Sequence, residues 1–135
     1  MRVIVDTSVW SLALRRKRSD DNPETAALNR IIEEGEDIFL IGIILQEVLQ
    51  GIKEPRDFRA VKEHLEAFPM FELERGDYIS AAALKNHLSK RGVQASTVDA
   101  LIAWTAIAND CRLFTSDRDF LHIATHSKLK LFGRS

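Results

Sequence analysis

Cysteine and long apolar runs are both scarce in this sequence. The 135 residues include one cysteine, Cys111, so no internal disulfide can form and no pair of cysteines offers the spacing of a zinc finger. The longest apolar run, 38–45, has eight residues counting its glycine, but a membrane-spanning helix needs about 20. The residues before Asp6 lack the apolar core of a signal peptide. We therefore expect a cytoplasmic protein with no membrane span.

Neither sign of charge dominates. The sequence has 19 lysines and arginines and 20 aspartates and glutamates, for a net charge of −1. A protein with this balance has no global positive field that would attract nucleic acid. Any binding of nucleic acid must therefore be local.

The composition is typical of one folded domain. The length lies within the usual range of about 100 to 200 residues per domain, so we expect residues 1–135 to form a single domain. Short apolar runs predict five strands, over residues 2–6, 38–42, 70–73, 113–115 and 129–132. Helical spacing of apolar residues predicts helices between them, clearest over 24–34, 55–68, 77–91 and 96–109, with stops at Gly35 and Gly92. This alternation indicates an α/β fold with a mostly parallel sheet.

Three stretches carry much less charge than the average of 29% for the whole chain. Each contains a single charged residue, which is always an acid: Asp6 in 3–14, Glu47 in 38–52 and Asp99 in 97–109. A carboxylate in an apolar element is costly unless it is paired, hydrogen-bonded or bound to a metal. No lysine or arginine lies beside any of these acids, so their presence needs another explanation.

The predicted elements place these acids at one edge of the sheet. Asp6 ends the first strand, Glu47 lies one turn into the helix after the second, and Asp99 lies in the first turn of a helix. Asp117 ends the fourth strand, with Asp119 two residues later. In an open parallel sheet, the carboxyl ends of strands and the amino ends of helices share the edge that binds ligands.

Converging acids without basic partners indicate a metal site. Such carboxylates raise each other's pKa unless divalent cations neutralise them. Oxygen ligands without cysteine or histidine favour Mg²⁺ or Mn²⁺ over zinc. Because Mg²⁺ commonly acts on phosphates, the pattern indicates hydrolysis of a phosphodiester.

Each acid also has an ordinary structural explanation. Asp6 could cap the helix that begins near Ser8, and Glu47 could accept from first-turn amides. Asp99 follows Ser96 at the spacing of a capping box. Any one acid alone is as readily structural as functional, so the case for a site rests on their joint placement at one edge.

The motifs that contain these acids resemble those of the PIN domain family, and within it the VapC-type toxins of toxin–antitoxin modules. The likeness covers nearly the whole chain and rests on Val3–Ser8 (VIVDTS), Leu45–Gly51 (LQEVLQG), Arg91–Gly92 with Val98–Ala103 (VDALIA), and Leu113–Phe120 (LFTSDRDF). The resemblance implies a three-layer α/β/α fold and a metal-dependent ribonuclease that acts on single-stranded or loop RNA. The family's acidic quartet falls on Asp6, Glu47, Asp99 and Asp117.

Other positions match supporting residues of the family's pocket. The polar residues that often line it correspond to Thr7, Ser8, Thr115 and Ser116, and a frequent supporting acid corresponds to Asp119. We rank Asp119 below the quartet, because it stands where the next helix is expected to begin and would then face away.

As a mechanism, the quartet would hold one or two Mg²⁺ ions, with Mn²⁺ as a substitute. The direct ligands would be Asp6, Asp99 and Asp117, and Glu47 would bind partly through water. An activated water would attack the phosphorus in line and leave 5′-phosphate and 3′-hydroxyl ends.

The resemblance also implies two protein partners. One is a VapB-like antitoxin whose C-terminal segment covers the active-site groove, which Trp10, Leu12 and Leu14 could line. The other is a second copy of the chain. A homodimer would also cover the helix over residues 98–108, which is apolar on nearly all sides.

Several alternatives remain open at this stage. The basic run Arg15, Arg16, Lys17 and Arg18 could hold an RNA backbone or could be a solvated loop. The domain could bind RNA or a partner without catalysis. A phosphotransfer domain with an aspartyl-phosphate intermediate is less favoured, because such sites need a late lysine or a second acid at the position of Ser8.

Overall fold

Five strands form one sheet in which every pairing is parallel. The computed structural model describes residues 1–14 and 22–133. Within these ranges the strands are β1 (Arg2–Val5), β2 (Asp37–Ile41), β3 (Met70–Phe71), β4 (Arg112–Phe114) and β5 (Lys130–Leu131). Their order in the sheet is β3-β2-β1-β4-β5, and each neighbouring pair is parallel. The expected parallel sheet is confirmed.

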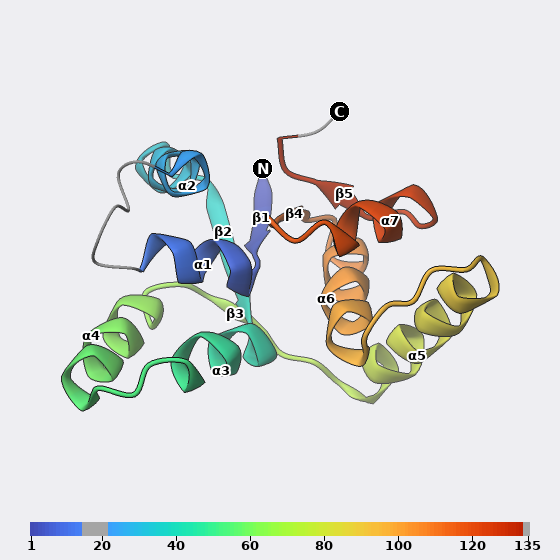
Figure 1. Cartoon of the computed structure of the whole chain (residues 1–135), viewed down its shortest axis with the longest axis horizontal. Coiled ribbons are helices and arrows are strands. Elements are labelled where there is room, and N and C mark those ends of the chain that lie inside the picture. The colour runs from blue at the N-terminus through green and yellow to red at the C-terminus, as the bar shows by residue number, and fades with distance from the viewer. Residues whose placement is uncertain (15–21, 134–135) are drawn as a thin grey trace.

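Helices cover both faces of this sheet. Those within the described ranges are α1 (Thr7–Ala13), α2 (Pro23–Glu33), α3 (Gly42–Gln50), α4 (Pro55–Leu65), α5 (Arg75–Lys90), α6 (Thr97–Ala108) and α7 (Asp119–Thr125). Figure 1 shows α1 to α4 on one side of the sheet and α5 to α7 on the other. The three-layer α/β/α architecture is therefore confirmed.

The core is built around β1, which lies at the centre of the sheet. Val3, Ile4 and Val5 are completely buried, because helices pack against both faces of the strand and β2 and β4 pair with both of its edges. β-Branched side chains suit such a strand, since their restricted rotamers fit a pleated and fully packed surface. The apolar opening of the sequence thus supplies the middle of the fold.

Most helix ends follow the sequence signals. Pro55 is the first residue of α4, and Gly35 and Gly92 follow α2 and α5 with φ angles of +74° and +79°, which glycine adopts without steric cost. Gly42 differs from expectation, because it opens α3 instead of ending the second strand. Phe68 lies beyond the end of α4, and its ring packs against that of Trp10 at a centroid distance of 5.4 Å.

Within residues 1–14 and 22–133, no helix is both long enough and apolar enough to cross a bilayer. The longest helix is α5, whose 16 residues are interrupted by charged side chains.

Candidate active site

The order of the strands creates a crevice beside β1. The strand that follows β1 in the sequence, β2, lies on one side of it, and β4 lies on the other. Open parallel sheets bind ligands at such a point, outside the carboxyl ends of the strands. Asp6 directly follows β1, and its backbone N–H donates to the carbonyl of Phe114 at the end of β4 (2.8 Å). Asp6 is thereby fixed at the crevice.

Two hydroxyls hold the Asp6 carboxylate, which is only 6% exposed. Ser8 Oγ donates to Asp6 Oδ2 at 2.8 Å, and Thr115 Oγ1 donates to the same oxygen at 2.9 Å. These bonds offset the cost of burying the charged group. Although Asp6 occupies the N-cap position of α1, its side chain makes no capping hydrogen bond. The simple capping explanation is therefore wrong for Asp6.

The same two hydroxyls also hold the loop that follows β4. The backbone N–H of Ser116 donates to Ser8 Oγ (3.1 Å), and that of Asp117 donates to Thr115 Oγ1 (3.0 Å). Residues from the two ends of the sequence thus form one hydrogen-bonded unit around the Asp6 carboxylate. Asp117 lies in this unit through its backbone, which leaves its side chain available for other contacts.

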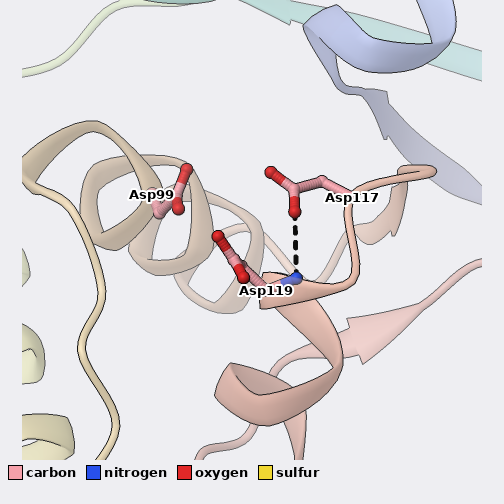
Figure 2. Close-up of side chains that lie close together, drawn as sticks. All are labelled: Asp99, Asp117 and Asp119. Atoms are coloured by element: carbon pink, nitrogen blue, oxygen red, sulfur yellow. Dashed lines mark hydrogen bonds between the residues drawn. The ribbon is translucent and has the colours of Figure 1, made fainter.

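Three aspartates converge next to this unit. Asp99 comes from the first turn of α6, and Asp117 and Asp119 come from the β4–α7 loop and the start of α7. One carboxylate oxygen from each residue lies within 4.8 Å of the others, and Figure 2 shows the three side chains pointing toward a shared space. A group of this size could coordinate one metal ion.

The three aspartates have acidic neighbours and no basic partner among the described residues. Partial burial, together with the negative charges of Asp117, Asp6 and Asp119, raises the pKa of Asp99 to about 6, although a hydrogen bond with Ser96 acts in the opposite direction. Every charged neighbour that affects this pKa is thus a carboxylate. Within the described part of the chain, no salt bridge joins Asp99, Asp117 or Asp119 to a lysine or arginine.

Glu47 is held by a hydrogen bond outside the aspartate group. Its Oε1 accepts a hydrogen bond from Thr7 Oγ1 (2.8 Å), which connects the middle of α3 to the first residue of α1. Glu47 is half-buried and lies in the second turn of its helix. It does not join the aspartate group in this structure, but its partner Thr7 is the residue next to Asp6. The structure therefore brings Glu47 to the same edge through Thr7.

The orientation of the Asp119 side chain differs from the expectation from the sequence. We expected it to face away from the pocket, but it belongs to the aspartate group. The backbone N–H of Asp119 donates to Asp117 Oδ1 at 2.9 Å (dashed line in Figure 2). This side-chain hydrogen bond to the backbone two residues on forms a local turn. The turn directs the first residue of α7 back toward Asp99.

The capping explanation holds in part for Asp99. Ser96 is the N-cap of α6, and its side chain accepts the hydrogen bond from the Asp99 backbone N–H (3.0 Å). Ser96 thus performs the capping that the sequence indicated, while the Asp99 carboxylate lies among other acids. The position of Asp99 in the first turn serves both the helix and the site.

One residue beside the site was not indicated by the sequence. Glu24, in the first turn of α2, lines a small pocket of about 120 Å³ together with Thr115, Ser116, Asp117 and other residues. An acid in a first helical turn is an ordinary stabilising feature, so nothing in the sequence distinguishes it. The basic run Arg15, Arg16, Lys17 and Arg18 lies outside the described residues.

The residues present suit a hard divalent cation. The group offers carboxylate oxygens alone, which Mg²⁺ and Mn²⁺ prefer. Besides partial burial, the neighbouring carboxylates Asp117, Asp6 and Asp119 raise the pKa of Asp99, and a bound cation would offset their negative charge. Asp6, which is buried beside this group and held by hydroxyls, could contribute a further oxygen.

Solved structures with the same fold include several toxin–antitoxin proteins. VapBC2 from Rickettsia felis, solved with a DNA fragment from its promoter, aligns with a TM-score of 0.77 and 18% identity, covering 97% of both chains. FitAcB from Neisseria gonorrhoeae aligns with a TM-score of 0.71 and 21% identity over 97% of this chain and 96% of the other. At these identities the likeness establishes the fold.

A third neighbour is described by its target. VapC20 from Mycobacterium tuberculosis, named as a toxin that cleaves the sarcin–ricin loop, aligns with a TM-score of 0.68 and 15% identity over 95% of this chain and 98% of the other. No curated protein matches the sequence significantly. The model of the PIN domain family matches residues 3–125, which is nearly the whole described chain. The protein therefore belongs to the PIN domain family.

Proposed function

We propose that this protein is a Mg²⁺-dependent endoribonuclease, the VapC-type toxin of a toxin–antitoxin pair. The observation that carries the proposal is the aspartate group Asp99, Asp117 and Asp119, which converges beside the buried Asp6 without a cationic partner. Family membership supports it, because Asp6, Asp99 and Asp117 correspond to three members of the family's acidic quartet and Asp119 corresponds to its supporting acid.

The chain's own residues would divide the work at this site. Asp99 and Asp117 would bind Mg²⁺, or Mn²⁺ in its place, together with Asp6, and Asp119 would support them. Glu47, whose carboxylate accepts a hydrogen bond from Thr7, would bind the ion partly through a water molecule. When bound, a divalent ion neutralises charge on a phosphate and lowers the pKa of a water molecule. In-line attack on the phosphorus would leave 5′-phosphate and 3′-hydroxyl ends.

We propose single-stranded or loop RNA as the substrate. Asp119 lies at the surface, so an extended strand could reach the aspartate group without entering a deep cavity. Base-paired RNA hides its base edges, and proteins that act on specific RNA positions mostly contact unpaired nucleotides. The VapC20 neighbour is named as a toxin that cleaves the sarcin–ricin loop, which supports a loop substrate here.

An antitoxin is the proposed regulatory partner. Structural neighbours were solved as toxin–antitoxin complexes. Leu14 lines a groove of about 430 Å³ with residues 51–54 and Val61, between α1, α3 and α4. Trp10 is buried in the core with 1% of its surface exposed, so it cannot line this groove as the sequence suggested. We propose that the antitoxin's C-terminal segment covers this groove.

Cleavage of a labelled pool of single-stranded RNA tests the function. Purified protein should cleave with Mg²⁺ or Mn²⁺ and lose activity in EDTA. Asp6→Asn should lower cleavage by more than about 100-fold, because it weakens a direct ligand for the ion. Asp37→Asn is a matched control, since Asp37 is an exposed acid at the opposite end of the sheet. It should cleave normally.

Two results would contradict the proposal. Equal cleavage by Asp6→Asn and Asp37→Asn would place the chemistry elsewhere. Absence of cleavage by folded protein that binds Mn²⁺ would instead indicate a PIN domain that binds RNA or a partner without catalysis.

A further inference from the structure

We propose that Ser8 and Thr115 are positioning residues, whose hydroxyls hold the Asp6 carboxylate so that it presents a single oxygen, Oδ1, to the cation. The inference rests on the proposed function for the presence of that cation. It assigns these hydroxyls to the protein's own carboxylate, and so differs from a role in which they contact the RNA phosphate directly.

The bonding capacity of the hydroxyls supports this assignment. A serine or threonine hydroxyl has one hydrogen to donate and two lone pairs that accept. Ser8 and Thr115 both donate to Asp6 Oδ2, at 2.8 and 2.9 Å, and both accept a backbone N–H from the loop after β4. Their two oxygens are 3.3 Å apart, with both hydrogens already directed at Asp6. Neither hydroxyl has a hydrogen left for a phosphate oxygen.

The same bonds leave the two carboxylate oxygens of Asp6 unequal. An ionised carboxylate has about two lone-pair sites on each oxygen. The two hydroxyls use those of Oδ2, while no hydrogen bond from another described side chain reaches Oδ1. A cation at this edge would therefore bind Asp6 through Oδ1 alone, in the monodentate manner that suits octahedral Mg²⁺.

The hydroxyls also set the distance between two of the proposed ligands. Through Ser8 the Asp6 carboxylate is connected to the backbone of Ser116, and through Thr115 to the backbone of Asp117. Loss of either hydroxyl would loosen the loop and release one lone pair of Oδ2. Hydrogen bonds that orient metal ligands are typically worth about 10- to 100-fold in metal affinity or activity.

Calorimetric titration with Mn²⁺ tests the proposal. Ser8→Ala and Thr115→Val each remove one hydroxyl, and each should weaken Mn²⁺ binding by about 10- to 100-fold. Thr115→Ser keeps the hydroxyl and should bind almost as the wild type does. Thr125→Val is the matched control, because the Thr125 hydroxyl donates to a carbonyl of its own helix (2.9 Å). It should bind Mn²⁺ normally.

A second readout separates positioning from contact with RNA. The affinity of each variant for uncleaved RNA in EDTA should equal that of the wild type, and the kcat of cleavage should fall while KM is unchanged. Thermal unfolding identifies the variants that remain folded. If only one of Ser8→Ala and Thr115→Val folds, that variant alone tests the proposal, because both hydroxyls donate to the same oxygen of Asp6.

Three outcomes would overturn the proposal. Mn²⁺ affinity could be unchanged in a folded Ser8→Ala or Thr115→Val variant. RNA affinity in EDTA could fall while Mn²⁺ affinity is retained, which would make the hydroxyls phosphate ligands. The wild type could bind no Mn²⁺ at all. Failure of the proposed function is a different result, because a wild type that binds Mn²⁺ through these residues yet cleaves no RNA contradicts only the nuclease assignment.

Discussion

Asp6 and Asp99 lie at the same edge of the sheet but in different surroundings. Asp6 is buried and receives two hydroxyl hydrogen bonds, which offset the cost of burying its charge. Asp99 lies among other carboxylates, and partial burial and their negative charge raise its pKa to about 6. A pH dependence of stability therefore follows for Asp99.

Asp99 makes the metal-free protein less stable as pH rises. Its folded-state pKa of about 6 lies above the ordinary aspartate value of 3.8, so the unfolded chain loses this proton at a lower pH than the folded protein does. The resulting stability penalty develops between these two values and is complete above the higher one. In EDTA, Asp99→Asn should have no advantage in free energy of unfolding near pH 4 and an advantage of roughly 1 kcal/mol near pH 7, after allowance for solvent screening.

Urea unfolding at several pH values measures this difference. Asp37→Asn is the control, because that acid is exposed at the other end of the sheet. If the difference in free energy of unfolding between Asp99→Asn and the wild type does not change with pH across this range, ionisation of Asp99 does not destabilise the protein. Saturating Mn²⁺ should remove the advantage, because a bound ion stabilises the wild type more than the variant.

Asp119 should contribute to metal binding. Its carboxylate lies within 4.8 Å of those of Asp99 and Asp117, so Asp119→Asn should weaken Mn²⁺ binding by about 10-fold in a calorimetric titration. Asp110→Asn replaces an exposed acid at the opposite end of β4 and should bind Mn²⁺ as the wild type does. Equal affinities of the two variants would exclude Asp119 from the site.

At the scale of residues, the sequence indicated the acids better than their partners. Asp6, Glu47 and Asp99 were found because each stands alone in an apolar stretch. The hydrogen bonds from Thr7 to Glu47 and from Thr115 to Asp6 span 40 and 109 positions, and hydroxyls are too common in sequences to indicate such contacts. The local turn at Asp119 depends on one side-chain hydrogen bond, which spacing alone does not reveal.

Three helices end with the same backbone arrangement. The third residue after α2, α5 and α6 donates its N–H to a carbonyl five positions back, as in Glu36 to Ile31, Val93 to Leu88 and Cys111 to Ala106. This Schellman motif places one residue in the left-handed region. Gly35 and Gly92 occupy it with φ angles of +74° and +79°, but at α6 it is Asp110, with φ of +51°.

Asp110→Gly should therefore stabilise the protein. Glycine removes the steric cost of a left-handed residue, which is about 1 kcal/mol. The ion pair lost with Lys130 is exposed and 3.6 Å long, so it contributes little. We expect the free energy of unfolding to rise by about 0.5 to 1 kcal/mol in urea titrations. Asp110→Ala loses the same ion pair but keeps a Cβ, so it should give no gain; a gain equal to that of glycine would contradict the backbone explanation.

At the scale of elements, the sequence predicted the long helices and their glycine stops and failed on the shorter features. The sequence placed the end of α6 correctly near residue 109, but no glycine follows this helix, so the left-handed conformation of Asp110 was not predicted. Gly42 was placed in a strand because its neighbours are apolar on both sides, and apolar runs alone do not separate a buried strand from a buried helix. In the structure the chain turns there from β2 into α3.

The molecule also exposes apolar surface in one region. Tyr78 and Ile79 on α5 are 55% and 63% exposed, and Tyr78 lines a groove with Met70 of the edge strand β3 and Leu101 of α6. The sequence indicated the apolar helix over 98–108 as the free surface, but α5 packs beside α6 and covers much of it (Figure 1). We propose that a second copy of the chain covers the exposed region on α5.

A single charge should disrupt this homodimer. Ile79→Glu places a carboxylate in the proposed interface and should convert dimer to monomer in sedimentation equilibrium, without lowering the melting temperature. Ile32→Glu is the matched control, because Ile32 is a 36% exposed isoleucine on α2. A wild type that is monomeric at all concentrations, or equal dissociation by both variants, would contradict the assignment of this surface.

The proposed ribonuclease activity requires a divalent cation at the carboxyl ends of β1 and β4. Anomalous diffraction from crystals soaked in Mn²⁺ locates such an ion directly. We predict a peak within coordination distance of carboxylate oxygens from Asp99 and Asp117, with Asp6 contributing through Oδ1. A map with no peak at this place, from crystals in which the aspartates are ordered, would contradict the proposed metal site.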